Sequence, residues 1–309
     1  MAESHERPLL TLADAATAPA AGAELAIAQP PGSEPIRKGM GLLFWLCLGW
    51  IVLMVVLAAT ASLLPLKNPS LQHYNFVNVG PSAQFPLGTD ELGRDMLSRI
   101  IYGSRVSLIV GFGSIIMGMV IGGTLGLLAG FRSGPIDTTL NAGSFVLLAF
   151  PPLLAIMVIE AFWGKTLWKL TFLFGLAAIP QLFRVVRAST LSVANREFVL
   201  AARSMGATTN RIIFRELLPN VVPSALSFAL IGVAVAIVLE GSLAFLGLSV
   251  QLPTASLGNI INEAAQQQNL TANPLAVVWP SLYIFVLLTA FNLMGDRLRS
   301  QFDVREGNL

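Results

Sequence analysis

The chain has 309 residues and a formal net charge of +2; 54% of its residues are hydrophobic and only 12% are charged. A soluble domain usually carries about 25% charged residues, so this composition excludes a protein that meets water over its whole surface. Lipid must cover part of the molecule. The small net charge gives no indication of a nucleic-acid partner.

Long apolar segments follow one another along the chain. Since a helix needs ~20 apolar residues to cross the hydrocarbon core of a bilayer, the sequence predicts membrane helices at about 42–64, 106–130, 140–161, 166–187, 221–246 and 276–295. Backbone polar groups have no partners in lipid, and the sequence lacks the alternating pattern of a membrane barrel, so each crossing should be a helix. The expected fold class is an all-α membrane protein with six transmembrane helices.

The start of the chain differs in composition from the rest. Residues 1–36 are rich in Ala, Pro, Glu and Thr without apolar periodicity, which predicts a disordered cytoplasmic tail before a transmembrane domain at 37–309. The first apolar segment is too long and begins too late for a cleaved signal peptide, so we expect it to remain as the first helix.

The orientation follows from the positive charges. With six crossings both termini share one side, and 13 of the 19 Lys and Arg residues then lie on that side. Cytoplasmic segments of membrane proteins carry an excess of Lys and Arg, so we expect both termini in the cytoplasm. The segment 247–274 contains neither Lys nor Arg, which agrees with an outward location.

The sequence offers little that could carry out chemistry. It contains no G-x-x-x-x-G-K-[ST] phosphate-binding loop; the nearest match ends at Gly164-Lys165-Thr166 but has Ile159 in place of the first glycine. Cys47 is the only cysteine, and the two histidines are far apart. We therefore expect no catalytic residues, no metal site and no cofactor in this chain.

A polar segment at 188–220 stands out among the short cytoplasmic connections. Within it, residues 197–205 favour a helix, and Phe198, Ala201, Ala202 and Met205 fall on one face at spacings of three and four. Gly206 is expected to end the helix. Two interpretations remain open on these residues alone: the helix inserts into a groove of a partner protein, or it lies on the lipid headgroups.

Several motifs carry a family resemblance. Residues 197–207, EFVLAARSMGA, followed by Leu218-Pro219-Asn220, resemble the EAA loop of ABC importer permeases. Further motifs are similar to the second type of subunit in dipeptide and oligopeptide (and nickel) permeases: LGTD at 87–90, GRD at 93–95, AFPP at 149–152, FLGLSVQ at 245–251 and AFNLMGD at 290–296. They extend over nearly the whole membrane part of the chain.

This resemblance implies the type I ABC importer permease fold and a function in import of dipeptides or oligopeptides. It also implies a heterodimer with a homologous permease, two cytoplasmic subunits or domains that bind ATP and Mg, and an extracytoplasmic substrate-binding protein. Nickel, glutathione or another small solute is the alternative cargo. The helix that couples to the ATPase would comprise Glu197, Phe198, Leu200, Ala201, Ala202, Arg203, Met205 and Gly206, with Pro219 beyond it.

The chain departs from the family pattern at three positions. Leu200 stands where the family usually has Glu, and Glu197, one turn earlier, is expected to supply the negative charge at the helix start. Ala142 and Phe145 stand where the subfamily often has Arg and Asp. Polar contacts made by the usual residues must be absent or replaced.

Two carboxylates lie in or near apolar segments, where a charge costs at least ~2.5 kcal/mol at mid-bilayer. Glu160 is close to Trp163 near the proposed outer boundary and is expected to be hydrated. Glu240, which the family resemblance includes, either lines or gates the outer end of a pathway or anchors the neighbouring segment by accepting backbone hydrogen bonds. The segment 81–105 is given no site, and Thr89-Asp90 is expected to cap the helix that follows.

Two further expectations concern packing and the rival function. Glycines recur every fourth residue from Gly118 to Gly130, which favours close packing within the bundle over a subunit interface. A proton-coupled secondary transporter that uses Glu240 is the alternative from another class. Such transporters usually have broken helices repeated in both halves, and the sequence shows no such pair.

Overall fold

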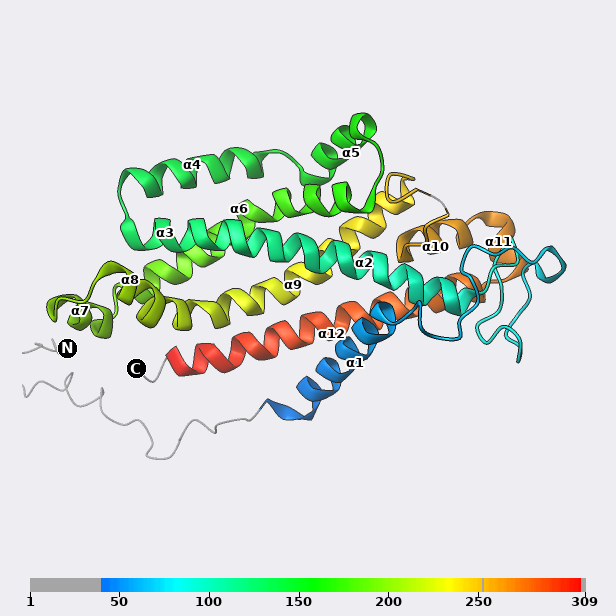
Figure 1. Ribbon diagram of the computed structural model, residues 1–309, viewed down its shortest axis with the longest axis horizontal. Coiled ribbons are helices and arrows are strands. Elements are labelled where there is room, and N and C mark those ends of the chain that lie inside the picture. The colour runs from blue at the N-terminus through cyan, green and yellow to red at the C-terminus, as the bar shows by residue number, and fades with distance from the viewer. Residues whose placement is uncertain (1–39, 252, 307–309) are drawn as a thin grey trace, which may run out of the picture. The chain divides into compact units, whose positions relative to one another are not determined.

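The computed structural model describes residues 40–251 and 253–306, so the tail predicted at 1–36 lies outside the described residues. The described chain is helical, with a single isolated β-bridge, between Thr89 and Asp95. Its α-helices (Figure 1) are α1 (Gly41–Ala59), α2 (Met96–Gly118), α3 (Thr124–Arg132), α4 (Pro135–Ala149), α5 (Pro152–Trp163), α6 (Leu167–Ala194), α7 (Glu197–Ser204), α8 (Thr209–Arg211), α9 (Leu218–Phe245), α10 (Leu257–Ala264), α11 (Gln267–Ala272) and α12 (Leu275–Glu306).

Five helical stretches are long and apolar enough to cross a membrane: Gly41–Ala59, Met96–Arg132, Leu167–Ala194, Thr209–Phe245 and Leu275–Phe302. The pair α4 and α5 gives a sixth if it counts as one bent span. The expected all-α membrane fold is therefore confirmed, with five or six crossings. Two of the spans include a π-helical turn, at Met119–Gly123 and Ile212–Leu217, that joins successive α-helices.

The third predicted helix, 140–161, is not straight. It is divided into α4 and α5, which meet at 75°. The break lies at Phe150 and Pro151, whose backbones are extended (φ −85°, ψ 129° and φ −61°, ψ 118°). A proline removes a helical N–H and forces the residue before it out of the helical region, so the Phe-Pro-Pro sequence ends one helix and begins another.

Several helices extend beyond their predicted bounds. The second begins at Met96, ten residues before the apolar run, and the fourth continues to Ala194. The cap of α2 is Asp95, whose carboxylate accepts the backbone N–H of Ser98 at 3.0 Å. The expectation that Thr89-Asp90 forms this cap is thus wrong.

The glycine repeat packs α2 and α3 against α6. A Cβ atom added at Gly122 would lie 2.3 Å from the carbonyl oxygen of Ile179, and one at Gly126 would lie 2.6 Å from that of Phe183. At Gly130 it would lie 2.7 Å from a side-chain carbon of Thr190. Only glycine permits backbones to approach so closely, and packing within the bundle is confirmed.

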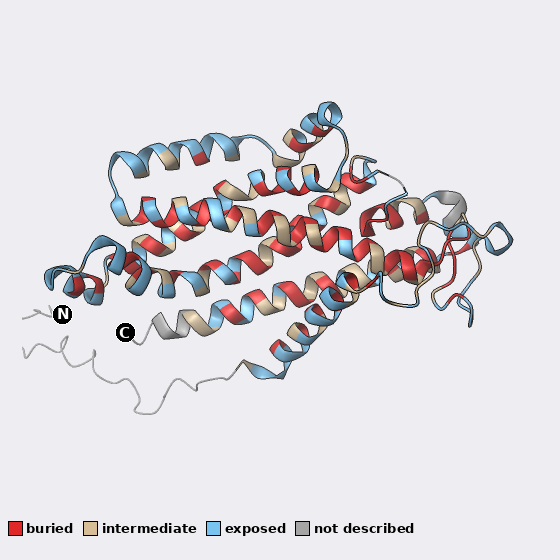
Figure 2. Cartoon of the chain, in the orientation of Figure 1, coloured by how far each residue is buried: buried red, intermediate tan, exposed pale blue. Residues whose placement is uncertain are grey.

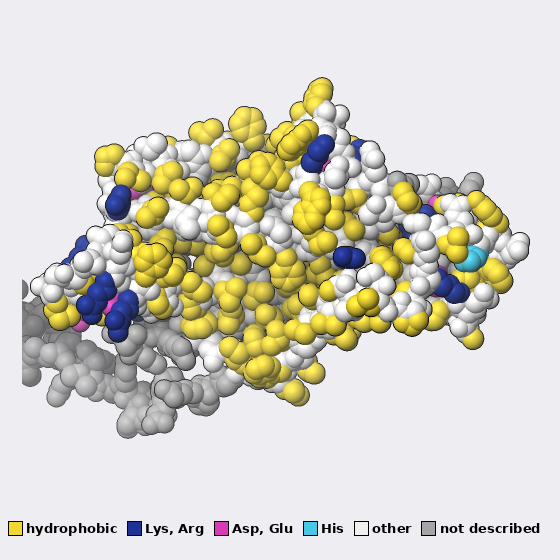
Figure 3. All heavy atoms as spheres, in the orientation of Figure 1, with side chains coloured by type: hydrophobic (Ala, Val, Ile, Leu, Met, Phe, Trp, Pro, Cys, Tyr) yellow, Lys and Arg dark blue, Asp and Glu magenta, His cyan; other side chains and the backbone are white. Residues whose placement is uncertain are grey.

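The interior of the bundle is organised around α9. Its buried residues Val233 and Ile237 belong to the same apolar cluster as Ile51 of α1 and Phe291 of α12. Burial is concentrated on α2, α6, α9 and α10, whereas α4 is exposed along most of its length (Figure 2). Apolar side chains cover the middle of the visible face, and most charged ones lie toward its two ends (Figure 3), the pattern expected of a protein surrounded by lipid.

Candidate functional site

The predicted helix in the polar segment is present as α7, at one end of the bundle (Figure 1). It begins at Glu197, and the backbone turns sharply at Gly206, where φ is +76°. An added Cβ there would meet nothing within 4 Å, so glycine is needed for its backbone conformation and not for space. Gly206 thus ends the helix as the sequence indicates.

The two faces of α7 have different surroundings. Val199 and Ala202 are buried, and Val199 packs in an apolar cluster with Ile212 and Leu217 of the following π-helical turn. Ala202 therefore does not share the exposure of the other three residues of the predicted face, because the chain folds back and covers this side of the helix. Phe198, Leu200, Ala201 and Met205 are exposed, as are Glu197, Arg203, Gly206 and Pro219.

The exposed side of α7 combines apolar and basic groups. Met205 is 81% exposed, and Phe214 in the neighbouring turn is 68% exposed. The guanidinium of Arg203 lies 5.0 Å from the ring of Phe131 on α3, within range of a cation–π contact. Large apolar side chains gathered in one exposed region are typical of a surface that binds a partner. Docking of an ATPase on this face stays a prediction.

One of the three departures from the family pattern, Phe145, has a local explanation. The guanidinium of Arg184 on α6 lies 5.2 Å from the ring of Phe145 on α4. One turn further along α6, Arg187 forms a two-point ion pair with Asp137, with Nη2 and Oδ2 2.6 Å apart. A cation–π contact and a neighbouring ion pair therefore join α4 to α6 where Phe145 replaces the usual carboxylate.

Glu240 is completely buried between three segments. Its Oε2 accepts a hydrogen bond from the hydroxyl of Ser107 on α2 at 2.8 Å, and its Oε1 accepts one from Ser249 at 2.7 Å. The carboxylate thus ties the segment after α9 to the bundle. Its donors are hydroxyl groups, so the expectation of backbone donors needs correction. A gating role for Glu240 stays a prediction.

A buried cluster of charges lies at the opposite end from α7, in the segment to which the sequence assigned no site. Arg94 donates to Asp90 and Glu263 at 2.6 Å in both cases, and Arg99 donates to Glu263 at 2.8 Å and also to Asp90. The cluster joins the start of α2 to α10. Asp90 and Glu263 are 173 positions apart, so only the GRD motif, with its closely spaced charges, hinted at this arrangement.

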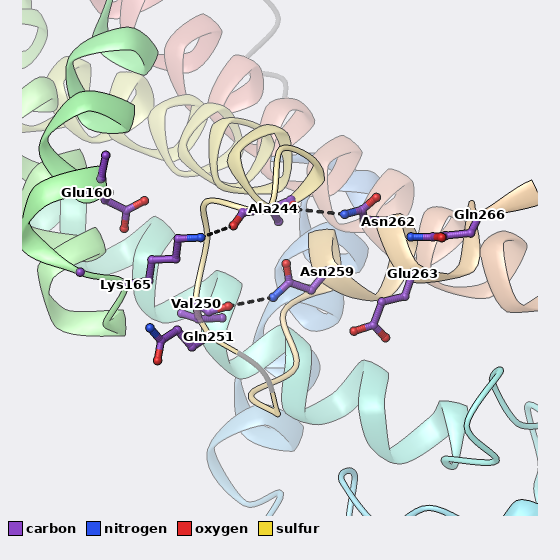
Figure 4. A pocket seen from close by; sticks show the side chains of 12 residues that line it. Glu160, Lys165, Ala244, Val250, Gln251, Asn259, Asn262, Glu263 and Gln266 are labelled. Atoms are coloured by element: carbon purple, nitrogen blue, oxygen red, sulfur yellow. Dashed lines mark hydrogen bonds between the residues drawn. The ribbon is translucent and has the colours of Figure 1, made fainter.

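Glu160 differs from the prediction most clearly. Its exposure is 1%, and neither carboxylate oxygen has a hydrogen-bond partner among the described residues, so the expected hydration is wrong. It lies on the wall of a cavity of about 660 Å³ (Figure 4), formed by elements at the end of the bundle opposite α7 (Figure 1). Lysine, amide and carboxylate side chains also line it: Lys165, Gln251, Asn259, Asn262, Glu263 and Gln266.

Five or six stretches long and apolar enough to cross a membrane, with an exposed helix at one end and a polar cavity at the other, define a multi-pass membrane protein. Residues 122–305 match the family described as binding-protein-dependent transport system inner membrane component. This match covers more than half of the chain. The chain belongs to this family, whose members work with a binding protein.

Individual relatives agree with this assignment. The glutathione transport system permease protein GsiD of Pectobacterium atrosepticum is 38% identical over 255 residues, which cover 82% of this chain and 84% of the relative. The di/tripeptide transport system permease protein DppC of Pseudomonas aeruginosa is 37% identical, with coverage of 87% and 88%. The dipeptide transport system permease protein DppC of Alkalihalophilus pseudofirmus is 35% identical, with coverage of 72% and 73%.

A solved structure has the same fold. A chain of the inward-facing MetNI methionine ABC transporter superposes with a TM-score of 0.55 and covers 67% of this chain and 97% of its own length. At 21% identity the likeness concerns the fold alone. The expected type I ABC importer permease fold is confirmed.

Proposed function

We propose that this chain is one transmembrane subunit of an ATP-driven importer of peptides. The observation that carries the proposal is its similarity, at 35–38% identity over most of its length, to permease subunits named for dipeptide, di/tripeptide and glutathione transport. Glutathione is itself a modified tripeptide, so the three cargoes share one chemical class. Small peptides are therefore the favoured cargo, and glutathione and nickel are the alternatives within the family.

The energy for import would come from other subunits. The sequence has no phosphate-binding loop, so ATP and Mg would be held by two cytoplasmic ATP-binding subunits. The exposed face of α7 supports docking on one of them, because Phe198 and Met205 project from a short helix as the anchors of a helix in a groove do. To shift a two-state transporter from 1:99 to 99:1 takes ~5.5 kcal/mol of differential binding, of which this contact would supply a share.

The remaining partners follow from the family and from the surface. A homologous permease would complete a heterodimer, and a binding protein would deliver cargo at the end opposite α7. Exposed apolar side chains on α5 and at the break before it, including Phe150, Leu154 and Phe162, would face lipid or that second permease. Both termini would lie in the cytoplasm, together with α7, in a bacterial inner membrane.

Purification and reconstitution test this function. The tagged chain is purified in mild detergent, co-purifying subunits are identified by mass, and the complex is reconstituted in liposomes with a loaded binding protein. We expect an ATPase pair and a second permease, and ATP-dependent uptake of dipeptides in a panel that includes glutathione and nickel. Uptake by the purified chain alone, driven by a proton gradient, would contradict the proposal and support a secondary transporter.

A further inference from the structure

The cavity beside Glu160 is formed by segments that are distant in the sequence. Its walls come from the end of α5 with the turn after it, the end of α9 with the segment that follows, and one side of α10 (Figure 4). Its volume of about 660 Å³ lies within the range of roughly 300–1,000 Å³ that is usual for small-molecule sites. A dipeptide or tripeptide therefore fits by size.

The carboxylate of Glu160 lacks the hydrogen-bond donors that contact Glu240 and Asp90. Glu240 accepts two hydroxyl hydrogen bonds, and Asp90 is paired with two arginines. Glu160 is as deeply buried, yet it has no donor on either oxygen among the described residues. A buried carboxylate is stable as an anion only with a cation or several donors beside it. As an anion, Glu160 would thus need a partner that the described residues do not supply by contact.

Lys165 is the nearest candidate within the cavity, but it has another partner. Its ammonium donates to the backbone carbonyl of Gly247 at 2.5 Å, and it forms no ion pair with Glu160. The cavity therefore contains a carboxylate and an ammonium that do not neutralise each other by contact. This is the charge pattern complementary to a zwitterion such as a free peptide.

The other lining groups suit a peptide backbone. Asn259 and Asn262 donate with their side-chain nitrogens to the carbonyls of Val250 and Ala244, at 3.2 and 3.4 Å. These bonds orient both amides and leave their oxygens as acceptors. Gln251 and Gln266 add two further amides to the wall. Amides donate and accept, so they can satisfy both the N–H and the C=O groups of a peptide.

We propose that Glu160 binds the terminal ammonium of a peptide in this cavity, as a cargo subsite within this subunit. The inference rests on the proposed function, because it presumes that peptides pass this end of the molecule. Both carboxylate oxygens are covered in the structure, so the Glu160 side chain would turn toward the cavity to pair with an ammonium that enters with the cargo. The carboxylate would therefore be paired only while cargo is present.

A protection experiment tests the subsite without the binding protein. Ala161→Cys places a reporter on the cavity wall outside the proposed peptide-binding groups, and Cys47→Ser removes the natural thiol. The complete complex is purified in detergent, and alkylation of the reporter by a maleimide is followed in the presence of dialanine, its methyl ester or N-acetyl-dialanine. We expect dialanine and its methyl ester, which keep the ammonium, to slow alkylation, whereas the acetylated peptide should not.

Variants of Glu160 sharpen the result. Glu160→Gln should raise the concentration of dialanine needed for half protection by about tenfold, as expected for loss of a charged hydrogen-bond partner. The control Glu91→Gln removes a carboxylate at the same end of the bundle but outside this cavity, and it should leave protection unchanged. If Glu160→Gln prevents assembly, the comparison of the three peptides on the complex that retains Glu160 still shows whether the ammonium is needed for protection.

Three outcomes would overturn the subsite: no peptide protects, the acetylated peptide protects as well as dialanine, or Glu160→Gln retains full protection. Uptake assays separate this failure from that of the proposed function. A complex that imports peptides but shows no protection refutes the subsite alone. Protection in a complex that imports no peptide refutes the function alone.

Discussion

The two ends of the helical bundle place charge and apolar surface in opposite ways. At the α7 end, apolar side chains such as Met205 are exposed. At the other end, Asp90, Arg94 and Arg99 are buried in one ion-pair cluster with Glu263. The buried charges of this cluster are therefore paired within the chain, whereas the exposed apolar side chains at the α7 end form a surface that a partner can cover.

The largest expected loss of stability comes from removing one cation from the buried cluster. Arg99→Met leaves the carboxylates of Asp90 and Glu263 short of a partner in a buried site. Breaking such a buried pair costs about 3–5 kcal/mol, and we expect the unfolding free energy of the purified complex to fall by that order. The measurement is an unfolding titration in mild detergent.

The matched control is Arg105→Met on the same helix. Arg105 is exposed, so its loss should change stability by less than about 0.5 kcal/mol. Equal effects of the two substitutions would show that the cluster adds nothing to the stability of this end.

A glycine substitution tests the close packing of helices in the middle of the bundle. Gly122→Ala places a Cβ 2.3 Å from the carbonyl oxygen of Ile179, so α2, α3 and α6 must move apart. Overpacking of this kind costs about 1–3 kcal/mol, and the same unfolding titration measures it. Gly49→Ala on α1, where an added Cβ meets nothing within 4 Å, should be neutral or stabilising. A neutral Gly122→Ala would contradict the close approach of the helices.

The α7 end is tested by the residue that terminates the helix. Gly206→Val forces a β-branched residue into a backbone with φ of +76°, which costs about 1–2 kcal/mol locally. We expect normal membrane insertion and preserved ATP hydrolysis but strongly reduced peptide uptake per ATP hydrolysed, because the direction of α7 would change.

Asn tolerates this backbone conformation better than other residues with a side chain, so Gly206→Asn is the control and should retain most of the uptake. Normal uptake by Gly206→Val would count against a coupling role of α7.

The same contrast explains what could be predicted from sequence. The apolar runs and the end of α7 at Gly206 depend on local residues, so the membrane helices and this helix follow from spacing and length. The Phe-Pro-Pro sequence indicates the bend at Phe150, but the apolar run continues across it and favours one straight helix. The helix start at Met96 was missed because Arg99 and Arg105 interrupt the apolar pattern.

The buried groups were beyond local inference. Glu263 is hydrogen-bonded to Arg94 and Arg99, which lie more than 160 positions away in the sequence, and no spacing rule connects residues so far apart. The nearby Trp163 favours a position for Glu160 at the outer membrane boundary, where a carboxylate is hydrated. Its burial depends on segments that pack against it from elsewhere in the chain, which the pattern of one helix cannot indicate.

The smallest expected effect on stability is at Met205, where packing within the chain and docking on a partner predict different results. Met205 is 81% exposed, so Met205→Ser should change the unfolding free energy of this chain by less than about 0.5 kcal/mol. If α7 docks in a groove of an ATPase, the same substitution removes an apolar anchor and should weaken retention of the ATPase on the tagged complex during washing in detergent. Met205→Leu keeps the volume and the apolar character and should retain the ATPase. Unchanged retention in Met205→Ser would show that the exposed methionine is not part of the docking surface, whereas a loss of stability would show that it packs within the chain.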